Sequence, residues 1–160
     1  MAKEKIKTLN ELEGIVSNLK NAKKKVVTTN GVFDILHIGH IKYLEKAKGM
    51  GDALIVGINS DASTKRLKGE KRPLNKELDR AEALAALECV DFVFVFEEDT
   101  PVDFLEVLKP DVHVKGGDYK LSQIIEKEAV ERNGGKVVLV PEIEGYATTK
   151  LINRIIEAYR

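Results

Sequence analysis

Two histidines, His37 and His40, lie where a strand pattern gives way to a helix pattern. Residues 26–29 form a short apolar, β-branched run, typical of a buried strand. A turn is expected at Asn30-Gly31, and apolar residues then recur at helical spacing. The amino end of a helix gathers backbone N–H groups and the positive end of its dipole, which together favour a bound anion. Imidazoles on one face of that helix end can donate to phosphate oxygens, so the pattern indicates phosphate chemistry.

The same histidines allow two other interpretations. They could be residues of a helix start or of the core, with no ligand. They could also join Asp34 as one carboxylate and two imidazoles around Zn²⁺. Gly39 lies between them and leaves room for a close ligand, which favours the phosphate interpretation. A Walker-type phosphate loop is excluded, because no Gly-x-x-x-x-Gly-Lys-Ser/Thr sequence occurs.

The elements that position these histidines alternate along the chain. Further strands are expected over residues 53–58, 92–96, 112–114 and 137–140. Helices are expected over residues 8–20, 77–88, 121–132 and 148–158, with another from Thr100-Pro101 to before Pro110, and the histidine helix should end near Gly49. Repeated strand–helix units imply parallel strands joined by right-handed crossovers. We therefore predict an α/β fold, a doubly wound five-stranded parallel sheet, as one domain over residues 1–160, with residues 26–160 as its core.

Local details follow from the same patterns. Asn10 and Glu13 are expected to cap the first helix, whose basic end at residues 23–25 leads into the core as a linker. Leu78 is expected on the inner side of its helix. The polar, basic stretch over residues 59–75 is longer than most connections, so it is either functional or disordered.

Composition limits the function classes. Basic and acidic residues balance at 26 each, so no global field attracts nucleic acid or an anionic membrane. No apolar run is long enough to span a membrane, and the amino terminus lacks the apolar core of a signal peptide. The single cysteine, Cys89, predicts a buried thiol in a reducing compartment. A cytoplasmic protein is expected.

Three of the predicted strands end in polar or glycine-rich motifs, at Gly31, Asn59 and Gly116. Carboxyl ends of parallel strands share one rim, where ligands of such sheets bind. The 59–75 stretch also carries cations suited to clamp a triphosphate, namely Lys65, Arg66, Lys68, Lys71 and Arg72. Because no aromatic residue is interleaved with them, an RNA-binding patch is not indicated.

Residues 31–40 have the form Gly-x-Phe-Asp-x-x-His-x-Gly-His, which resembles the cytidylyltransferase-like nucleotidyltransferases. Residues 59–69, residues 114–119 and the pair Thr148-Thr149 resemble the D-glycero-β-D-manno-heptose 1-phosphate adenylyltransferases of that family. The resemblance implies a Rossmann-like nucleotidyltransferase fold. It assigns catalysis to His37, His40 and Lys68. It assigns nucleotide binding to Asn30, Gly31, Phe33, Gly39, Asn59, Asp61, Arg80, Thr148 and Thr149. It assigns acceptor binding to Asp34, Lys115, Gly116, Gly117 and Asp118.

Spacing alone would place Arg80 on a helix surface, and one hydroxyl of Thr148-Thr149 would serve as a helix cap. Ala147 departs from the family, where a serine is common. The implied reaction transfers AMP from ATP, with Mg²⁺ on the triphosphate, to a sugar phosphate, foremost heptose 1-phosphate. Glycerol-3-phosphate with CTP, FMN with ATP, and a nucleotide-binding regulatory module without turnover remain alternatives. The sequence leaves the oligomeric state open, and a homodimer is compatible with it.

Overall fold

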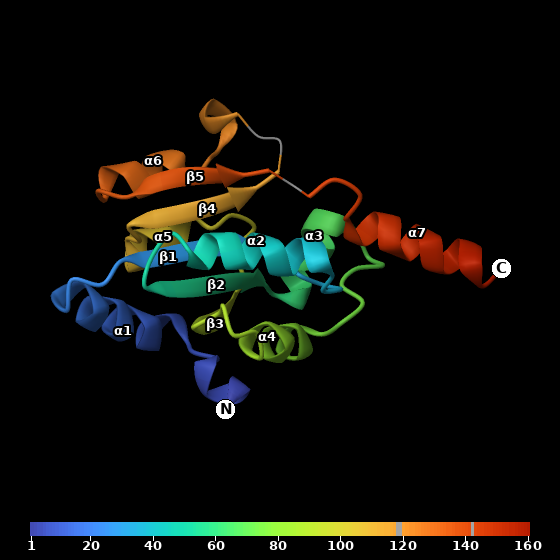
Figure 1. The fold of residues 1–160 in the computed structure, drawn as a ribbon, viewed down its shortest axis with the longest axis horizontal. Coiled ribbons are helices and arrows are strands. Elements are labelled where there is room, and N and C mark those ends of the chain that lie inside the picture. The colour runs from blue at the N-terminus through green and yellow to red at the C-terminus, as the bar shows by residue number, and fades with distance from the viewer. Residues whose placement is uncertain (118–119, 142) are drawn as a thin grey trace.

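The computed structural model describes residues 1–117, 120–141 and 143–160, so Asp118, a predicted acceptor-binding residue, lies outside the described residues. Five parallel strands form one sheet in the order β3-β2-β1-β4-β5. The strands are β1 (Val26–Gly31), β2 (Ala53–Asn59), β3 (Phe92–Phe96), β4 (Val112–Gly116) and β5 (Lys136–Val140). The order reverses at β1, as in a doubly wound sheet, and the predicted fold class is confirmed (Figure 1).

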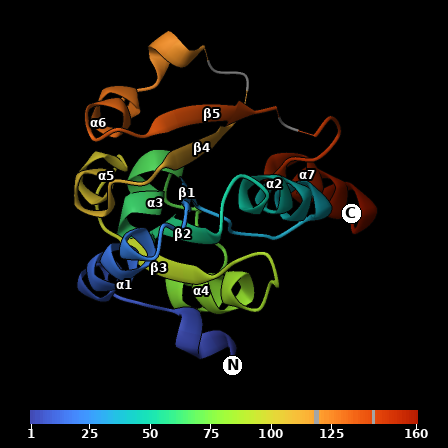
Figure 2. The same cartoon turned by 60° about the vertical axis from the view of Figure 1, so that its left-hand side comes forward.

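Helices cover both faces of the sheet. They are α1 (Leu9–Asn21), α2 (Ile38–Lys48), α3 (Asp61–Lys68), α4 (Glu77–Ala85), α5 (Val102–Leu108), α6 (Lys127–Arg132) and α7 (Thr148–Ala158), with short 3-10 turns η1 (Ala2–Lys5) and η2 (Leu121–Gln123). In Figure 2, α1, α5 and α6 lie on one side of the sheet, with α2 and α7 on the other. Two clusters of buried side chains, one on each face, hold these layers together.

The amino-terminal segment packs on one face of the sheet through α1 and along its β3 edge through Ile6. Leu12 and Val16 of α1 are buried with α5 side chains, and Ile6 bridges Val93 along the outer strand β3. The predicted capping pair is wrong by two residues. Thr8 caps α1, because its hydroxyl accepts from the Glu11 backbone and the Glu11 carboxylate accepts from the Thr8 N–H.

Two expected elements differ in the structure. Residues 61–68 of the basic stretch form α3, where a polar connection was expected, because Ser60 caps the helix and Ser63 and Thr64 form its buried side. Residues 121–132 are not one helix. Ile124 adopts an extended conformation and is buried in the core, so α6 begins only at Lys127.

Two single-residue expectations also need correction. Leu78 is 67% exposed, because Arg80, Ala81 and Leu84 occupy the inner side of α4. Cys89 is only half-buried, and burial raises the pKa of its thiol.

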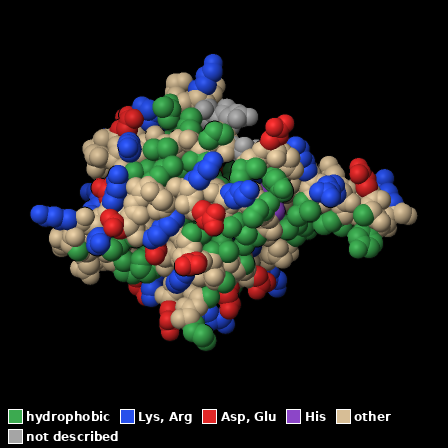
Figure 3. All heavy atoms as spheres, viewed as in Figure 1, with side chains coloured by type: hydrophobic (Ala, Val, Ile, Leu, Met, Phe, Trp, Pro, Cys, Tyr) green, Lys and Arg blue, Asp and Glu red, His purple; other side chains and the backbone are tan. Residues whose placement is uncertain are grey.

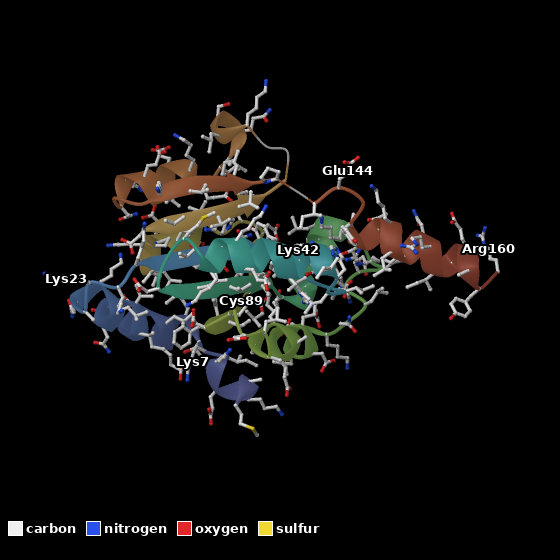
Figure 4. The ribbon with its side chains drawn as sticks, viewed as in Figure 1. Lys7, Lys23, Lys42, Cys89, Glu144 and Arg160 are labelled. Carbon is white, nitrogen blue, oxygen red and sulfur yellow. The ribbon has the colours of Figure 1, made fainter. Side chains whose placement is uncertain are left out.

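Within the described ranges, none of the helices is long and apolar enough to cross a membrane. The face in Figure 3 carries mixed charges with α7 projecting from the body, and Figure 4 labels Glu144 just before α7.

Candidate active site

A cavity of about 710 Å³ opens at the carboxyl edge of β1, β2 and β4. It brings together thirteen of the residues assigned by resemblance, from segments far apart in the sequence. They are Asn30, Gly31, Phe33, Asp34, His37, Gly39, His40, Asn59, Lys68, Lys115, Gly116, Thr148 and Thr149. Asp61, Arg80 and Gly117 do not line the cavity. The convergence on one rim follows from the parallel sheet, whose strands all end there.

The two histidines form a stacked pair in the cavity wall. Their ring centroids lie 3.8 Å apart with an interplanar angle of 21°. Both ring nitrogens of His37 and Nδ1 of His40 are buried without a hydrogen-bond partner among the described residues. Buried polar atoms in proteins are nearly always paired, so these nitrogens indicate a site for a ligand with hydrogen-bonding atoms.

Burial sets the charge of the pair. It lowers the pKa of His37, and together with the neighbouring His37 ring it lowers the pKa of His40 to about 4, against a smaller opposing effect of the Ile35 backbone. Both rings are therefore neutral near pH 7 when no anion is bound. Phosphate oxygens placed beside them would favour the protonated form, so the pair can gain positive charge as the ligand binds.

The chain turns into the site at Phe33 and not at Asn30-Gly31, where the turn was expected. Asn30 and Gly31 still belong to β1, whereas Phe33 has a left-handed φ of 49°. Its ring packs edge-on against His40, with centroids 5.3 Å apart. A Cβ on Gly31 would come within 2.9 Å of the Phe33 ring, so glycine is required there. Phe33 thus supports one side of the histidine stack.

Two helix amino ends face the cavity without a side-chain cap. His37 is the N-cap of α2 and makes no capping bond, and Ala147 is the N-cap of α7. The expected threonine cap of α7 is therefore wrong, because Thr148 is already the first helical residue. Uncapped backbone N–H groups at two helix starts suit anionic oxygens.

Tyr146 connects the two helix starts and was not singled out from the sequence. Its ring is stacked with that of His37 at a centroid distance of 6.3 Å. A Cβ on Gly39 would lie 2.9 Å from both His37 Nδ1 and Tyr146 Cβ. Gly39 therefore makes room for these two side chains, in addition to any ligand.

Asp34 holds the end of the basic stretch against the site. Its carboxylate is buried and accepts from the Leu74 N–H at 2.8 Å, the Asn75 N–H at 2.8 Å and Arg72 Nε at 2.6 Å. Burial by itself raises the pKa of Asp34, but these donors outweigh it and lower the pKa. Since the carboxylate is occupied in this way, it is not placed as a ligand of a zinc ion. Within the described ranges, no group of three His, Cys, Asp or Glu side chains is placed to hold a metal.

Arg80 lies behind the cavity wall. The surface position expected from spacing is wrong, since the residue is 1% exposed. Its guanidinium donates to the Asn75, Val32 and Asn59 carbonyls and to the Asp61 carboxylate, at 2.7 to 3.0 Å. Arg80 therefore joins the ends of β1 and β2 to the segment before α4.

Another wall of the cavity comes from β2 and α3. Asn59 is buried at the end of β2 and its amide donates to Ser63 Oγ at 3.0 Å. Lys68 lies in the last turn of α3 and lines the cavity, whereas Lys71 does not. Arg66 is not among the lining residues and pairs with Asp99 of the lining at 2.8 Å. The cations of the basic stretch thus have separate positions and do not form a diffuse patch.

The opposite wall is built by β4 and the start of α6. Lys115 and Gly116 line it, and a Cβ on Gly116 would lie 3.2 Å from the Tyr43 ring. Tyr43 and Glu126 also line the cavity and were missed from the sequence. Tyr43 follows His40 by three residues, so its place on the same helical face was a signal that could have identified it. Glu126 had none, because it lies in a predicted helix with ordinary surface charges.

Comparison with known proteins agrees with this geometry. The chain matches the cytidylyltransferase-like family over residues 28–155. It is 55% identical over 155 residues to a protein of Geobacter metallireducens, and 54% identical over 155 residues to one of Geobacter sulfurreducens, both named bifunctional protein HldE. These matches cover 97% of this chain and 32% of each relative, so the chain spans about a third of their length.

Solved structures show the same fold. A lipopolysaccharide core biosynthesis protein from Thermoplasma volcanium is 32% identical with a TM-score of 0.63, covering 78% of this chain and 99% of that one. A pantoate–beta-alanine ligase from Francisella tularensis, 19% identical, covers 95% of this chain and 77% of its own with a TM-score of 0.64, and this likeness concerns the fold alone. The chain belongs to the cytidylyltransferase-like family of nucleotidyltransferases.

Proposed function

We propose that this chain transfers AMP from ATP to a sugar 1-phosphate, with D-glycero-β-D-manno-heptose 1-phosphate as the first acceptor to test. The products are then ADP-heptose and pyrophosphate. The observation that carries the proposal is the stacked pair of His37 and His40, whose unpartnered ring nitrogens lie in a cavity faced by two uncapped helix starts. The heptose acceptor is supported by the motif resemblance and by relatives named HldE.

In the proposed reaction, a phosphate oxygen of the acceptor attacks the α-phosphorus of ATP. The bond from that phosphorus to the bridging oxygen breaks, and pyrophosphate leaves with the electron pair. No covalent intermediate with the protein is needed, so the protein positions the two phosphates and stabilises the developing charge. His37 and His40 donate to the oxygens on the α-phosphorus, and Lys68 neutralises the departing pyrophosphate.

The two walls then divide the substrates. Asn30, Gly31, Phe33, Gly39, Asn59, Thr148 and Thr149 form the proposed nucleotide side, and Asp61, which does not line the cavity, would act through its contact with Arg80. Lys115 and Gly116 form the proposed acceptor side, to which Gly117 and Asp118 are assigned by resemblance alone. Asp34 and Arg80 contribute by holding the Arg72–Asn75 segment and the strand ends in place, which follows from their contacts with backbone groups.

Nucleotidyl transfer generally uses a divalent metal together with the triphosphate, and Mg²⁺ is the ion in our proposal. Mg²⁺ prefers oxygen ligands and retains much of its water, so substrate phosphates would supply most of its ligands. Asn30 lines the cavity with a buried side-chain oxygen that no described residue contacts by a hydrogen bond, which fits such an ion or its water. When bound, the ion would neutralise charge on the triphosphate.

The decisive experiment measures pyrophosphate release with ATP or CTP, each paired with heptose 1-phosphate, glycerol-3-phosphate or FMN. ATP with heptose 1-phosphate should be fastest. Asp118→Ala should raise KM for heptose 1-phosphate more than KM for ATP, because a carboxylate suits sugar hydroxyls. Faster turnover with FMN would overturn the sugar acceptor and leave the transfer class. No release with any pair would favour the regulatory alternative.

The proposal extends to the setting of the enzyme. Its substrates are those of a cytoplasmic reaction, and cell fractionation should recover the protein with other ATP-using cytoplasmic enzymes.

A homodimer is also part of the proposal. Sedimentation equilibrium would give twice the 17.8 kDa of one chain, and the mass of a single chain would contradict it.

A further inference from the structure

A buried line of polar side chains runs from the sheet interior to the acceptor wall. Thr28 Oγ1 contacts His113 Nδ1 at 2.9 Å, and both residues are fully buried. His113 Nε2 lies 3.7 Å from Glu126 Oε1, and Lys115 Nζ donates to that same oxygen at 2.6 Å. Lys115 and Glu126 line the cavity, so the line of contacts ends at the site.

The charges along this line are defined by burial and pairing. Burial acts to raise the pKa of Glu126, but contacts with His113 and Lys115 prevail and lower it to about 2. Burial lowers the pKa of His113, so the ring is neutral. The wall therefore holds a Glu126 carboxylate, 3% exposed, beside the Lys115 ammonium. An ion pair this buried is retained at a desolvation cost, which is a reason to look for a role beyond stability.

The chemistry of the groups also fixes their direction. A carboxylate only accepts, so the His113 nitrogen that faces Glu126 is the one suited to carry the proton. His113 Nδ1 is then the acceptor, and the Thr28 hydroxyl donates to it. At 3.7 Å His113 Nε2 makes no hydrogen bond to Glu126, but a proton on it favours the nearby carboxylate electrostatically. The hydrogen bond that restricts the ammonium is the one from Lys115 to Glu126.

We propose that Glu126 is a positioning residue of the acceptor site, which directs the Lys115 ammonium toward the acceptor's phosphate. The inference rests on the proposed function for its ligand, a phosphorylated acceptor. A lysine side chain has many rotamers, so holding its ammonium in place before binding reduces the entropy lost on binding. The buried Thr28–His113 pair supports the carboxylate.

The test is a double-mutant cycle on Glu126→Gln and Lys115→Ala, with steady-state KM measured separately for acceptor and ATP. Glu126→Gln should raise the acceptor KM about tenfold and leave the ATP KM within about twofold. In the Lys115→Ala background, the same change should leave the acceptor KM unaltered, because Glu126 acts through Lys115. Glu131→Gln, on the exposed side of α6, is the matched control.

Equal effects of Glu126→Gln in both backgrounds would overturn the proposal, and so would equal increases in both KM values or none. If the single variant does not fold, Glu126→Asp keeps the charge and should show a smaller rise in acceptor KM.

A second readout does not depend on turnover. The ¹⁵N resonance of the Lys115 ammonium should be visible in the wild type because the group is held in place, and it should shift or broaden in Glu126→Gln because the charged partner is removed. A shifted or broadened resonance with no activity toward any acceptor would count against the proposed function alone. An unchanged resonance would count against the positioning role.

Discussion

The amino ends of α2 and α3 follow neighbouring strands at the same edge of the sheet, yet only that of α3 has a side-chain cap. At α3, the Ser60 hydroxyl accepts from the Ser63 N–H, and the Asp61 N–H donates to Glu77. At α2, the N-cap is His37, whose side chain makes no capping bond. A closed helix start stabilises the fold, whereas an open one leaves N–H groups for an anion. A strand–helix junction alone therefore does not identify a phosphate site. The N-cap residue decides whether the first N–H groups of the helix remain available to an anion.

The largest effect is expected at the open junction. His40→Ala should lower kcat by about 100- to 1000-fold, since it removes a donor to charge that develops in the transition state. The ATP KM should stay within about threefold. Steady-state pyrophosphate release measures both, and Lys42→Ala on the exposed side of α2 is the control. Wild-type turnover in His40→Ala would falsify the assignment.

The next effect concerns stability, at the residue that connects the two junctions. Arg80→Met leaves the Val32, Asn59 and Asn75 carbonyls without their donor, and should cost about 3 kcal/mol of unfolding free energy. Urea unfolding provides the measurement. Arg66→Met removes an exposed pair and should change stability by less than about 0.5 kcal/mol. Similar losses in the two variants would show that burial of the Arg80 contacts is unimportant.

The two ends of α3 offer a second comparison. Its carboxyl end carries Lys68, which lines the cavity, whereas its amino end is capped by Ser60 and leaves no open anion site. Lys68→Ala should lower kcat/KM about tenfold, and Lys71→Ala by less than about twofold, since Lys68 lines the cavity and Lys71 does not. The measurement is pyrophosphate release at subsaturating ATP. Equal losses would mean that the stretch supplies only diffuse charge.

The capping difference itself can be tested by closing the other open helix start, that of α7. Ala147→Asp supplies a cap, so it should stabilise the protein by up to about 1 kcal/mol. It should also weaken ATP binding several-fold, because the carboxylate occupies N–H groups and repels phosphates. Ser60→Ala at α3 should instead cost about 1 kcal/mol and leave ATP affinity unchanged. Calorimetric titration together with thermal unfolding separates the two effects, and unaltered affinity in Ala147→Asp would contradict an anion site at α7.

The last effect is a pH dependence from the buried ring of His40. The pKa of His40 is about 4 in the folded protein against an ordinary 6.5, so the unfolded chain binds more protons between these values. This contribution to stability is complete above pH 6.5 and is lost as the pH falls toward 4. Urea unfolding across this window should show a shallower slope in His40→Ala. An identical slope would mean that the ring is not buried as described.

Hydrophobic patterning was sufficient for most of the fold. Continuous apolar strands and amphipathic helices predicted the parallel sheet, and the expected bounds of α7 match the observed ones. The pattern failed at α3, because the buried side of that helix is formed by Ser63 and Thr64 in place of apolar residues. It also failed at Ile124, where one buried apolar residue lies in an extended segment between two helical turns.

The sequence by itself determined the rim of the site. His37, His40 and Thr148 lie at helix starts, Asn59 and Lys115 lie at the carboxyl ends of strands, and parallel strands bring such residues together whatever the details of packing. Their side-chain types also indicated phosphate as the ligand.

Only the tertiary structure decided what each side chain contacts. Asp34 holds the backbone of Leu74 and Asn75, Arg80 lies behind the cavity, and Glu126 faces Lys115 from a different segment. These contacts join residues distant in sequence, and their energies depend on burial and on which donors remain unpaired. Local spacing carries no information about either quantity. Spacing therefore placed Arg80 on a helix surface, whereas the structure buries it behind the cavity wall.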